Sequence, residues 1–208
     1  DYRSCSYTGY GVIMRHGVDT EREISVHLQQ IDRGPNYRWG MAHEGGCGTV
    51  YYYADGKSYS YNGKEDAGDR RCEDVCMSTN FGVWKDNTYR SVGMNELRAP
   101  LRALGSVQYA KITARETDAY SFPEYRSRAV LLAGGDYIVT YDEVDSPNVY
   151  TRYSWFVKKG EDFPNIQFIK GITFDQFAVK GYAYSEHITA QSCGRWYEGN
   201  GDCMAVVS

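Results

Sequence analysis

One segment of this 208-residue chain combines residue types that could carry acid–base chemistry. Within residues 37–48, His43 stands beside Glu44, and glycines follow at positions 45, 46 and 48. A histidine can accept a proton near neutral pH, and glycines let the backbone approach a ligand closely. The alternative interpretation is structural: His43 caps a turn, and the glycines accommodate a bulge and a disulfide. The residues alone leave both interpretations open.

Strands on either side of residues 37–48 must hold this segment in place. Residues 24–29 alternate apolar and polar side chains, which predicts a strand on its N-terminal side. Residues 49–54 lead into Asp55-Gly56, a type I′ hairpin signal, and residues 58–61 return as the partner strand. Only residues 95–104 look helical, for a turn or two, because Pro100 interrupts them. Further strands are predicted over residues 107–113, 125–132, 137–144, 150–157, 166–169, 172–179 and 187–191.

Many strands without helices between them predict an all-β fold. We expect one antiparallel β-sandwich of two packed sheets, with long loops and disulfides, over residues 1–208. The 20 tyrosines and 22 glycines agree with this, because tyrosine favours pleated surfaces and glycine favours turns. Exposed tyrosines also suit carbohydrate binding, although filling strand positions is the simpler role for them.

The charge balance excludes some classes of protein. A formal net charge of −4 argues against nucleic-acid or membrane-surface binding, which would show a basic excess. It leaves room for an acidic polysaccharide, since a local cluster of arginines can hold carboxylates. No stretch of 18 apolar residues predicts a membrane span, and no signal peptide is visible. The chain opens on Asp1, so we expect a processed product or a piece of a longer polypeptide.

The even number of cysteines predicts disulfides and an oxidising, secreted location, either extracellular or periplasmic. The six cysteines allow fifteen pairings, and the sequence alone does not choose among them. Cys72 with Cys76, and Cys193 with Cys203, stand close enough to close short loops, which would leave Cys5 with Cys47. Zinc is the rival interpretation, but no C-x-x-C pair is present and no histidine stands at ligand spacing. No cofactor is expected.

Several short motifs follow one another in the order of a known family. Residues 9–15 (G-Y-G-V-I-M-R) give an opening strand, residues 43–48 stand where the family has an H-x-H-x-D-x-G turn, and residues 53–56 resemble its Y-A-x-G hairpin. Residues 79–82, 128–144 and 153–156 resemble its H-N-T-V, R-x-V…G-D-Y-x-V-V-x-D-x-V and Y-x-W segments. This order resembles the β-sandwich domain of the heparinase II/III-like polysaccharide lyases. It covers about residues 9–160 and leaves 161–208 for C-terminal strands and a disulfide loop.

The resemblance implies β-elimination at a uronate sugar. In that chemistry a base removes the proton α to the carboxylate while a second group neutralises the developing enolate. It implies catalytic roles for His43 and Tyr52, and a carboxylate clamp at Arg38. Other substrate-binding residues would then be Trp39, Glu44, Tyr51 and Tyr53.

Two departures from the family pattern stand out. The second histidine and the aspartate of the turn have no clear counterparts, because Glu44 and Gly46 stand near those places, so a metal is not supported. In these lyases a helical toroid also supplies one wall of the cleft, and this chain has none. We therefore expect the toroid in the parent polypeptide or in a partner chain.

The second hypothesis is a non-catalytic module, either glycan-binding or a structural domain that self-associates. The missing histidine and toroid favour it. Its tyrosines would form a sugar-stacking face, or its edge strands would pair with another copy.

Overall fold

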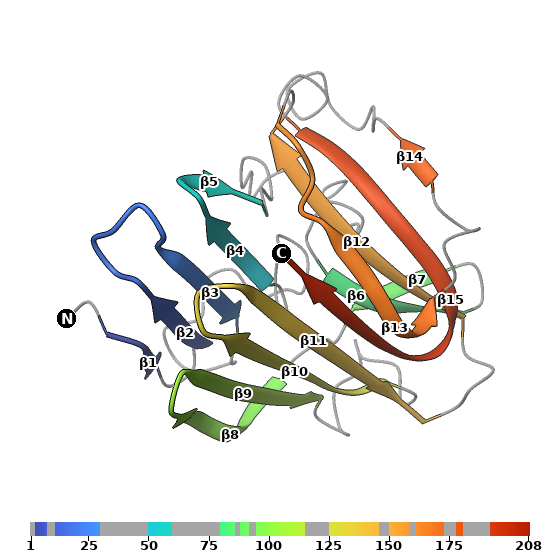
Figure 1. Cartoon of the computed structure of the whole chain (residues 1–208). Helices are drawn as coiled ribbons and strands as arrows, with labels where there is room; N and C mark the ends of the chain where they lie inside the picture. Colours follow the sequence, from blue (N-terminus) through green and yellow to red (C-terminus); the bar gives the residue numbers. More distant parts are fainter. Residues whose placement is uncertain are drawn as a thin grey trace, which may run out of the picture.

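The computed structural model describes residues 3–7, 11–29, 50–59, 80–85, 88–91, 95–114, 125–145, 150–158, 161–172, 178–180 and 192–208. Within these ranges the regular structure is β-strand throughout, and no helix is found. None of the described residues belongs to a helix that is long and apolar enough to cross a membrane. The strands form two antiparallel sheets (Figure 1), so the predicted all-β class is confirmed.

The first sheet has five strands in chain order. They are β1 (Cys5–Tyr7), β2 (Gly11–His16), β3 (Ile24–Gln29), β4 (Val50–Ala54) and β5 (Lys57–Ser58). Strands β4 and β5 are joined at Asp55-Gly56, where φ is 51° and 73°. Two successive positive φ values are what a type I′ turn requires, so the hairpin predicted from this dipeptide is confirmed.

The second sheet follows the order β7-β6-β12-β15-β11-β10-β9-β8. Two further strands, β13 and β14, pair with β15 outside that path. The bounds are β6 (Asn80–Lys85), β7 (Thr88–Ser91), β8 (Asn95–Leu104), β9 (Val107–Ala114), β10 (Tyr125–Ala133), β11 (Tyr137–Val144), β12 (Tyr150–Lys158), β13 (Ile166–Ile172), β14 (Ala178–Lys180) and β15 (Ser192–Val207).

Strand β15 joins the two halves of this second sheet. Its first part pairs with β12, from Ser192 to Asn200, and its second part pairs with β11, from Cys203 to Val207. Between them the chain bends at Gly201, where φ is 76°. This strand was not predicted from the sequence, because its glycines and the Asn200-Gly201 pair are typical of a turn.

Asp202 fixes the bend of β15 to its neighbours. Its carboxylate accepts hydrogen bonds from the Val144 amide (3.0 Å), the Tyr141 hydroxyl (3.1 Å) and Lys170 Nζ (2.6 Å). Burial works against ionisation of Asp202, yet the hydrogen bonds that its carboxylate accepts hold its pKa below the usual value. At Gly171 a Cβ would lie 1.8 Å from the Asp202 carbonyl oxygen, so only glycine fits where β13 passes the bend.

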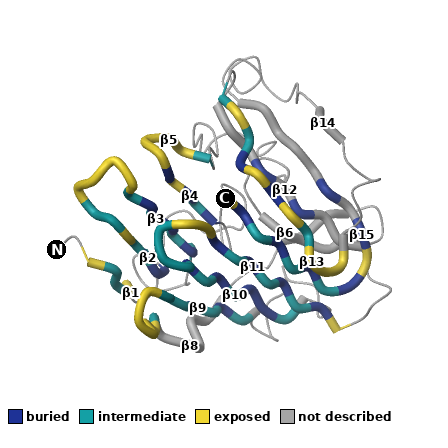
Figure 2. Tube along the Cα trace, in the orientation of Figure 1, coloured by how far each residue is buried: buried dark blue, intermediate teal, exposed yellow. Residues whose placement is uncertain are grey.

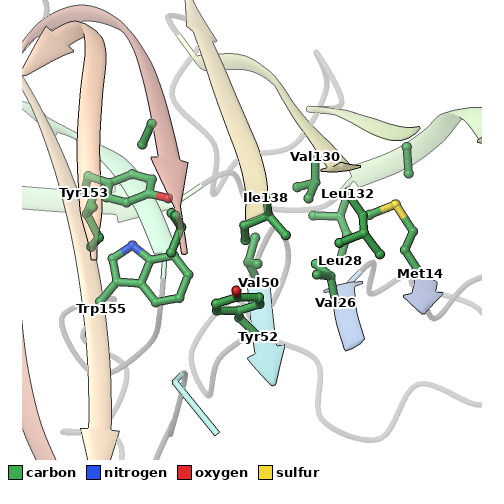
Figure 3. Packing of buried hydrophobic residues seen from close by; sticks show 14 of the residues in the cluster. Met14, Val26, Leu28, Val50, Tyr52, Val130, Leu132, Ile138, Tyr153 and Trp155 are labelled. Carbon is green, nitrogen blue, oxygen red and sulfur yellow. The ribbon is translucent and has the colours of Figure 1, made fainter. Parts of the chain in front are cut away.

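The core lies between the facing surfaces of the two sheets. Along β3 and β4 buried and more exposed residues alternate (Figure 2), as expected for strands with one face inward. Figure 3 shows side chains of the first sheet meeting those of the second: Met14, Val26, Leu28, Val50 and Tyr52 lie opposite Val130, Leu132 and Ile138. Burying these apolar side chains stabilises the sandwich.

The predicted helix over residues 95–104 is wrong. This segment is β8, the edge strand beside β9, and its register shifts on either side of Ala99. Pro100 has no N–H to donate, which excludes it from a central ladder but is tolerated at an edge or a bulge. The proline therefore marks an edge strand, not an interrupted helix.

The predicted disulfides are not supported. Cys5 and Cys203 are free thiols, which goes against the candidate pairs Cys5–Cys47 and Cys193–Cys203. Cys193 and Cys203 belong to the same strand, where they face Val157 of β12 and Asp142 of β11. The seven residues from Cys193 to Asn200 alone span roughly 23 Å of strand, and the three residues across the bend can return at most about 10 Å, whereas a disulfide needs Cα atoms about 4.4–6.8 Å apart. Cys47, Cys72 and Cys76 lie outside the described residues.

The packing predicts a large difference between two leucines. Leu28 is fully buried, while Leu104 at the end of β8 is 75% exposed. Leu28→Ala should lower the free energy of unfolding by about 2–5 kcal/mol, because it leaves a cavity. Leu104→Ala should change it by less than about 0.5 kcal/mol. Urea unfolding of both variants measures this, and equal losses would contradict the assignment of the core.

Candidate functional site

The three tyrosines predicted to form part of the site stand on one short strand, β4. Because successive side chains of a strand point to opposite faces, β4 divides them between the two surfaces of its sheet. Val50, Tyr52 and Ala54 are buried, whereas Tyr53 is 40% exposed. The structure therefore places Tyr52 apart from Tyr51 and Tyr53.

Tyr52 is a member of the aromatic core. It is 2% exposed, stacks on Tyr59 with ring centroids 5.6 Å apart, and meets Trp155 edge-on at 6.4 Å. Burial, with added repulsion from Tyr59 and Asp55, raises the pKa of Tyr52 to about 12. This environment suits a packing residue better than a group that exchanges protons with a polymer in solution.

Tyr51 and Tyr53 share the outer face of the first sheet with several other side chains. In register, Cys5, Ile13, His27 and Tyr51 stand side by side on β1, β2, β3 and β4. The rings of His27 and Tyr51 stack 5.4 Å apart at an interplanar angle of 17°. Tyr7, at 48% exposure, adds a third tyrosine to this face. We call His27, Tyr51, Tyr53 and Tyr7 the outer aromatic face.

The other predicted site residues fall outside the described part of the chain. Arg38, Trp39, His43 and Glu44 belong to residues 30–49, which the structure does not describe. Their proximity to the outer aromatic face, and so the composition of the predicted catalytic turn, stays a prediction.

A buried ion pair lies on the inner face of the second sheet. Arg128 of β10 and Asp142 of β11 are direct cross-strand partners, with exposures of 1% and 0%. Arg128 Nε donates to Asp142 Oδ1 at 2.6 Å, and Nη2 donates to Oδ2 at 3.2 Å. This two-bond geometry matches the guanidinium fork to the carboxylate, which is the strongest arrangement for such a pair.

Polar and aromatic groups from two more strands surround the ion pair. The Arg128 guanidinium lies 5.9 Å from the ring centroid of Tyr153 on β12, and the Tyr153 hydroxyl shares a 2.8 Å hydrogen bond with Thr140. Cys203 of β15 stands opposite Asp142 in the ladder. Burial, followed by the charge of Asp142, raises the pKa of the Cys203 thiol, and this keeps it protonated.

The ion pair was not predicted as a site, although its signal is present in the sequence. Arg128 occupies the inward series of β10 with Val130 and Leu132, and Asp142 occupies that of β11 with Ile138. A charged residue in each of two neighbouring inward series indicates a buried pair, because neither charge would be stable there alone. The role of the ion pair is structural: it joins β10 to β11 at the place where β12 and β15 come close to both.

Among the described residues, no group of three or more histidines, cysteines, aspartates and glutamates is arranged to hold a metal ion.

Comparison with solved structures gives the fold a precedent. The whole chain superposes on a heparinase III gene product with methylated lysines at a TM-score of 0.66 and 14% sequence identity. It also superposes on the heparan sulfate lyase HepC from Pedobacter heparinus (TM-score 0.66, 11% identity) and on a further heparinase III (TM-score 0.65, 11% identity). This chain has the fold of part of a heparinase III.

The match covers only part of each heparinase chain. The chain is covered completely, but it spans only 35–36% of the length of those three structures. No family model matches the sequence, and no curated protein matches it either. The resemblance noted from the motif order is thus supported by the fold of the entire chain.

The burial of Tyr52 predicts a specific dependence of stability on alkaline pH. Because its folded-state pKa of about 12 exceeds the ordinary 10.0, the stabilisation is complete below pH 10 and is lost as the pH rises toward 12. Tyr52→Phe should make the fall in the urea midpoint over this interval shallower. Tyr53→Phe, which removes a hydroxyl from the outer face instead, is the control. Identical slopes for wild type and Tyr52→Phe would refute the assignment.

The ion pair predicts a non-additive pair of substitutions. Arg128→Met leaves Asp142 buried without its guanidinium, so the free energy of unfolding should fall by about 3–5 kcal/mol. Adding Asp142→Leu removes the stranded charge and should restore most of that loss. Urea unfolding of the single and double variants measures both effects. A double variant less stable than Arg128→Met would show that the two residues do not act as a pair.

Proposed function

We propose that this chain is the β-sandwich portion of a secreted polysaccharide lyase that cleaves a uronate-containing glycan by β-elimination. The observation that carries the proposal is the superposition of the whole chain on two heparinase III structures and a heparan sulfate lyase. The motif order along residues 9–160 supports it independently of the fold. The proposal of secretion rests on this similarity in fold alone, because the disulfides that first suggested it are not supported.

The reaction assigns each predicted residue a task. A base removes the proton at the carbon next to the uronate carboxylate, and a cationic or hydrogen-bonding group stabilises the enolate that forms. We assign the base to His43 and the carboxylate clamp to Arg38. Tyr52 is the weaker candidate for proton transfer, because it is 2% exposed and its pKa is about 12. Trp39, Glu44, Tyr51 and Tyr53 are the proposed contacts to the sugar.

The chain supplies only part of the catalytic cleft in this proposal. It spans about a third of the length of the heparinases, so the remaining wall comes from a helical toroid elsewhere in the polypeptide or in a partner chain. Acidic polysaccharide is then held between the sandwich and that second domain. The chain alone is expected to bind such a glycan weakly and to cleave it slowly or not at all.

The outer aromatic face favours a second candidate, a glycan-binding module without catalysis. Stacked and exposed rings on one sheet surface, such as His27 on Tyr51 with Tyr53 nearby, suit the apolar face of a sugar. In this case Tyr53→Ala weakens glycan binding, while His43→Ala changes neither binding nor cleavage.

The assay for β-elimination is the ultraviolet absorbance of the unsaturated uronate product. For the parent polypeptide, or the chain mixed with its helical partner, His43→Ala should reduce the rate at least about 100-fold, the usual contribution of a general base. His187→Ala, to which no role is assigned, is the matched control. Full activity in His43→Ala, or no cleavage of any uronate polysaccharide by the assembled protein, would reject the lyase proposal and leave the binding module.

A further inference from the structure

The outer side of the second sheet carries apolar residues where a sheet that faces water carries polar ones. Strands that are covered on both faces contain continuous apolar runs, whereas a strand with one wet face alternates. Such runs occupy residues 129–133 of β10 (A-V-L-L-A), 137–139 of β11 (Y-I-V) and 204–207 of β15 (M-A-V-V). Strand β3 of the first sheet alternates instead, with polar residues at its three outward positions. The second sheet therefore has the sequence of a sheet with a partner on its outer side.

The register of the strands gathers these outward residues into three rows. In the middle row, Leu131 of β10 stands between Tyr109 of β9 and Val139 of β11, and Val206 of β15 follows Val139 (Figure 1). The rows on either side consist of Val107, Ala133 and Tyr137, and of Lys111, Ala129, Tyr141 and Met204. None of these side chains is buried, and Tyr137 is 39% exposed. We call this surface the three-row face.

The three-row face has the size of a stable protein interface. With the flanking strands β8 and β13 it crosses six strands about 4.8 Å apart, and its rows repeat about every 6.8 Å, so it covers roughly 600 Å². Stable complexes bury roughly 600–1,000 Å² on each partner. An apolar surface of this extent on one side of a sheet indicates an interaction site.

The charged residues within and beside the rows are paired with one another. Lys111 Nζ lies 3.3 Å from Glu143 Oε2, and Lys170 Nζ lies 2.6 Å from Asp202 Oδ2. Because each of these cations has its own carboxylate, a second copy of the same face brings no net repulsion. An anionic lipid surface is a poorer occupant, since the chain carries a formal net charge of −4.

Two charged residues at the margins of the face have no such pairing. Arg102 of β8 and Asp136 of the β10–β11 turn are exposed, and neither forms an ion pair within the part of the chain that the structure describes. Arg102 stands beside Tyr109, while the next residue, Ala103, lines the space between the sheets together with Gln108. Arg102 is therefore on the outward side, like the three rows.

We propose that two copies of this chain stack through the three-row face about a twofold axis. From the centre of the face, between Leu131 and Val139, Arg102 lies roughly 12 Å away across the strands and Asp136 roughly 10 Å away along them. Since the two distances are similar, a twofold axis that crosses the face diagonally exchanges the two positions, and Arg102 of each copy meets Asp136 of the other. The strands of the two stacked sheets then cross at close to a right angle, which is one of the two preferred arrangements of packed sheets.

This dimer leaves the first sheet open. The outer aromatic face belongs to the first sheet and lies on the opposite side of the sandwich from the three-row face. In the dimer the two outer aromatic faces point away from each other, so each stays accessible to a ligand. The dimer is therefore independent of the proposed lyase chemistry, and neither proposal fails with the other.

Sedimentation equilibrium of the 208-residue chain measures the association. The expected result is twice the monomer mass, which falls toward the monomer mass on dilution. A monomer mass at every concentration up to about 1 mM overturns the proposal, because so weak an association does not belong to a stable interface. A parent polypeptide that stays monomeric while the chain alone dimerises also overturns it, since the rest of the polypeptide then covers the face.

Two tyrosines of equal exposure locate the interface. Tyr137→Glu should weaken dimerisation at least about tenfold, because it places an unpaired carboxylate in the three-row face. Tyr53→Glu is the matched control, since Tyr53 is 40% exposed but lies on the first sheet, and it should leave the dissociation constant unchanged. Urea unfolding shows that both variants are folded. Equal weakening by the two substitutions, or no weakening by Tyr137→Glu, overturns the assignment of the face.

A charge exchange tests how the two copies are oriented. Arg102→Glu and Asp136→Arg should each weaken the dimer, because each places two like charges opposite one another across the interface. The double variant Arg102→Glu/Asp136→Arg restores the opposite charges and should recover most of the affinity. A double variant that dimerises more weakly than either single variant overturns the proposed stacking.

Discussion

The pleat of the first sheet is the constraint on which the arrangement of this protein depends. Strand β4 lies between β3 and β5, and its inward series Val50, Tyr52 and Ala54 packs against the second sheet. A shift of one residue would turn Tyr51 and Tyr53 into the core and expose Tyr52. The register that forms the core therefore also decides which tyrosines can meet a ligand. Any site on this sheet is confined to its outer face and to its rims.

The second sheet meets a different constraint, because it must accommodate two buried charged side chains at its centre. The Arg128–Asp142 pair lies where β10, β11, β12 and β15 come together, and Tyr153 and Thr140 complete its surroundings. Such a pair costs desolvation, so its value lies in specifying one arrangement of neighbours rather than in added stability. Together with the Asp202 carboxylate at the bend of β15, it explains how one long strand serves two halves of a sheet.

Local signals in the sequence predicted much of this fold. Alternation in residues 24–29 and the Asp55-Gly56 turn were sufficient because both depend on a few neighbouring residues. One prediction failed and one strand was missed where long-range pairing decides: Pro100 marks an edge strand, not an interrupted helix, and β15 continues through Asn200-Gly201, a pair typical of a turn. The candidate pair Cys193–Cys203 failed for the same reason, since spacing along the chain does not show that the two residues lie on separate parts of β15, opposite β12 and β11. Tyr52 was predicted as catalytic from a motif, and its burial became visible only with the register.

The tyrosines of β4 are divided between core and surface, and this division can be measured directly. Tyrosine nitration of the folded chain, followed by mass spectrometry of the peptides, reports the accessibility of each ring. We predict nitration at Tyr53 under native conditions and at Tyr52 only after unfolding, because the two are 40% and 2% exposed. Nitration of Tyr52 as fast as Tyr53 in the folded protein would contradict the register, the core and the assignment of the outer aromatic face together.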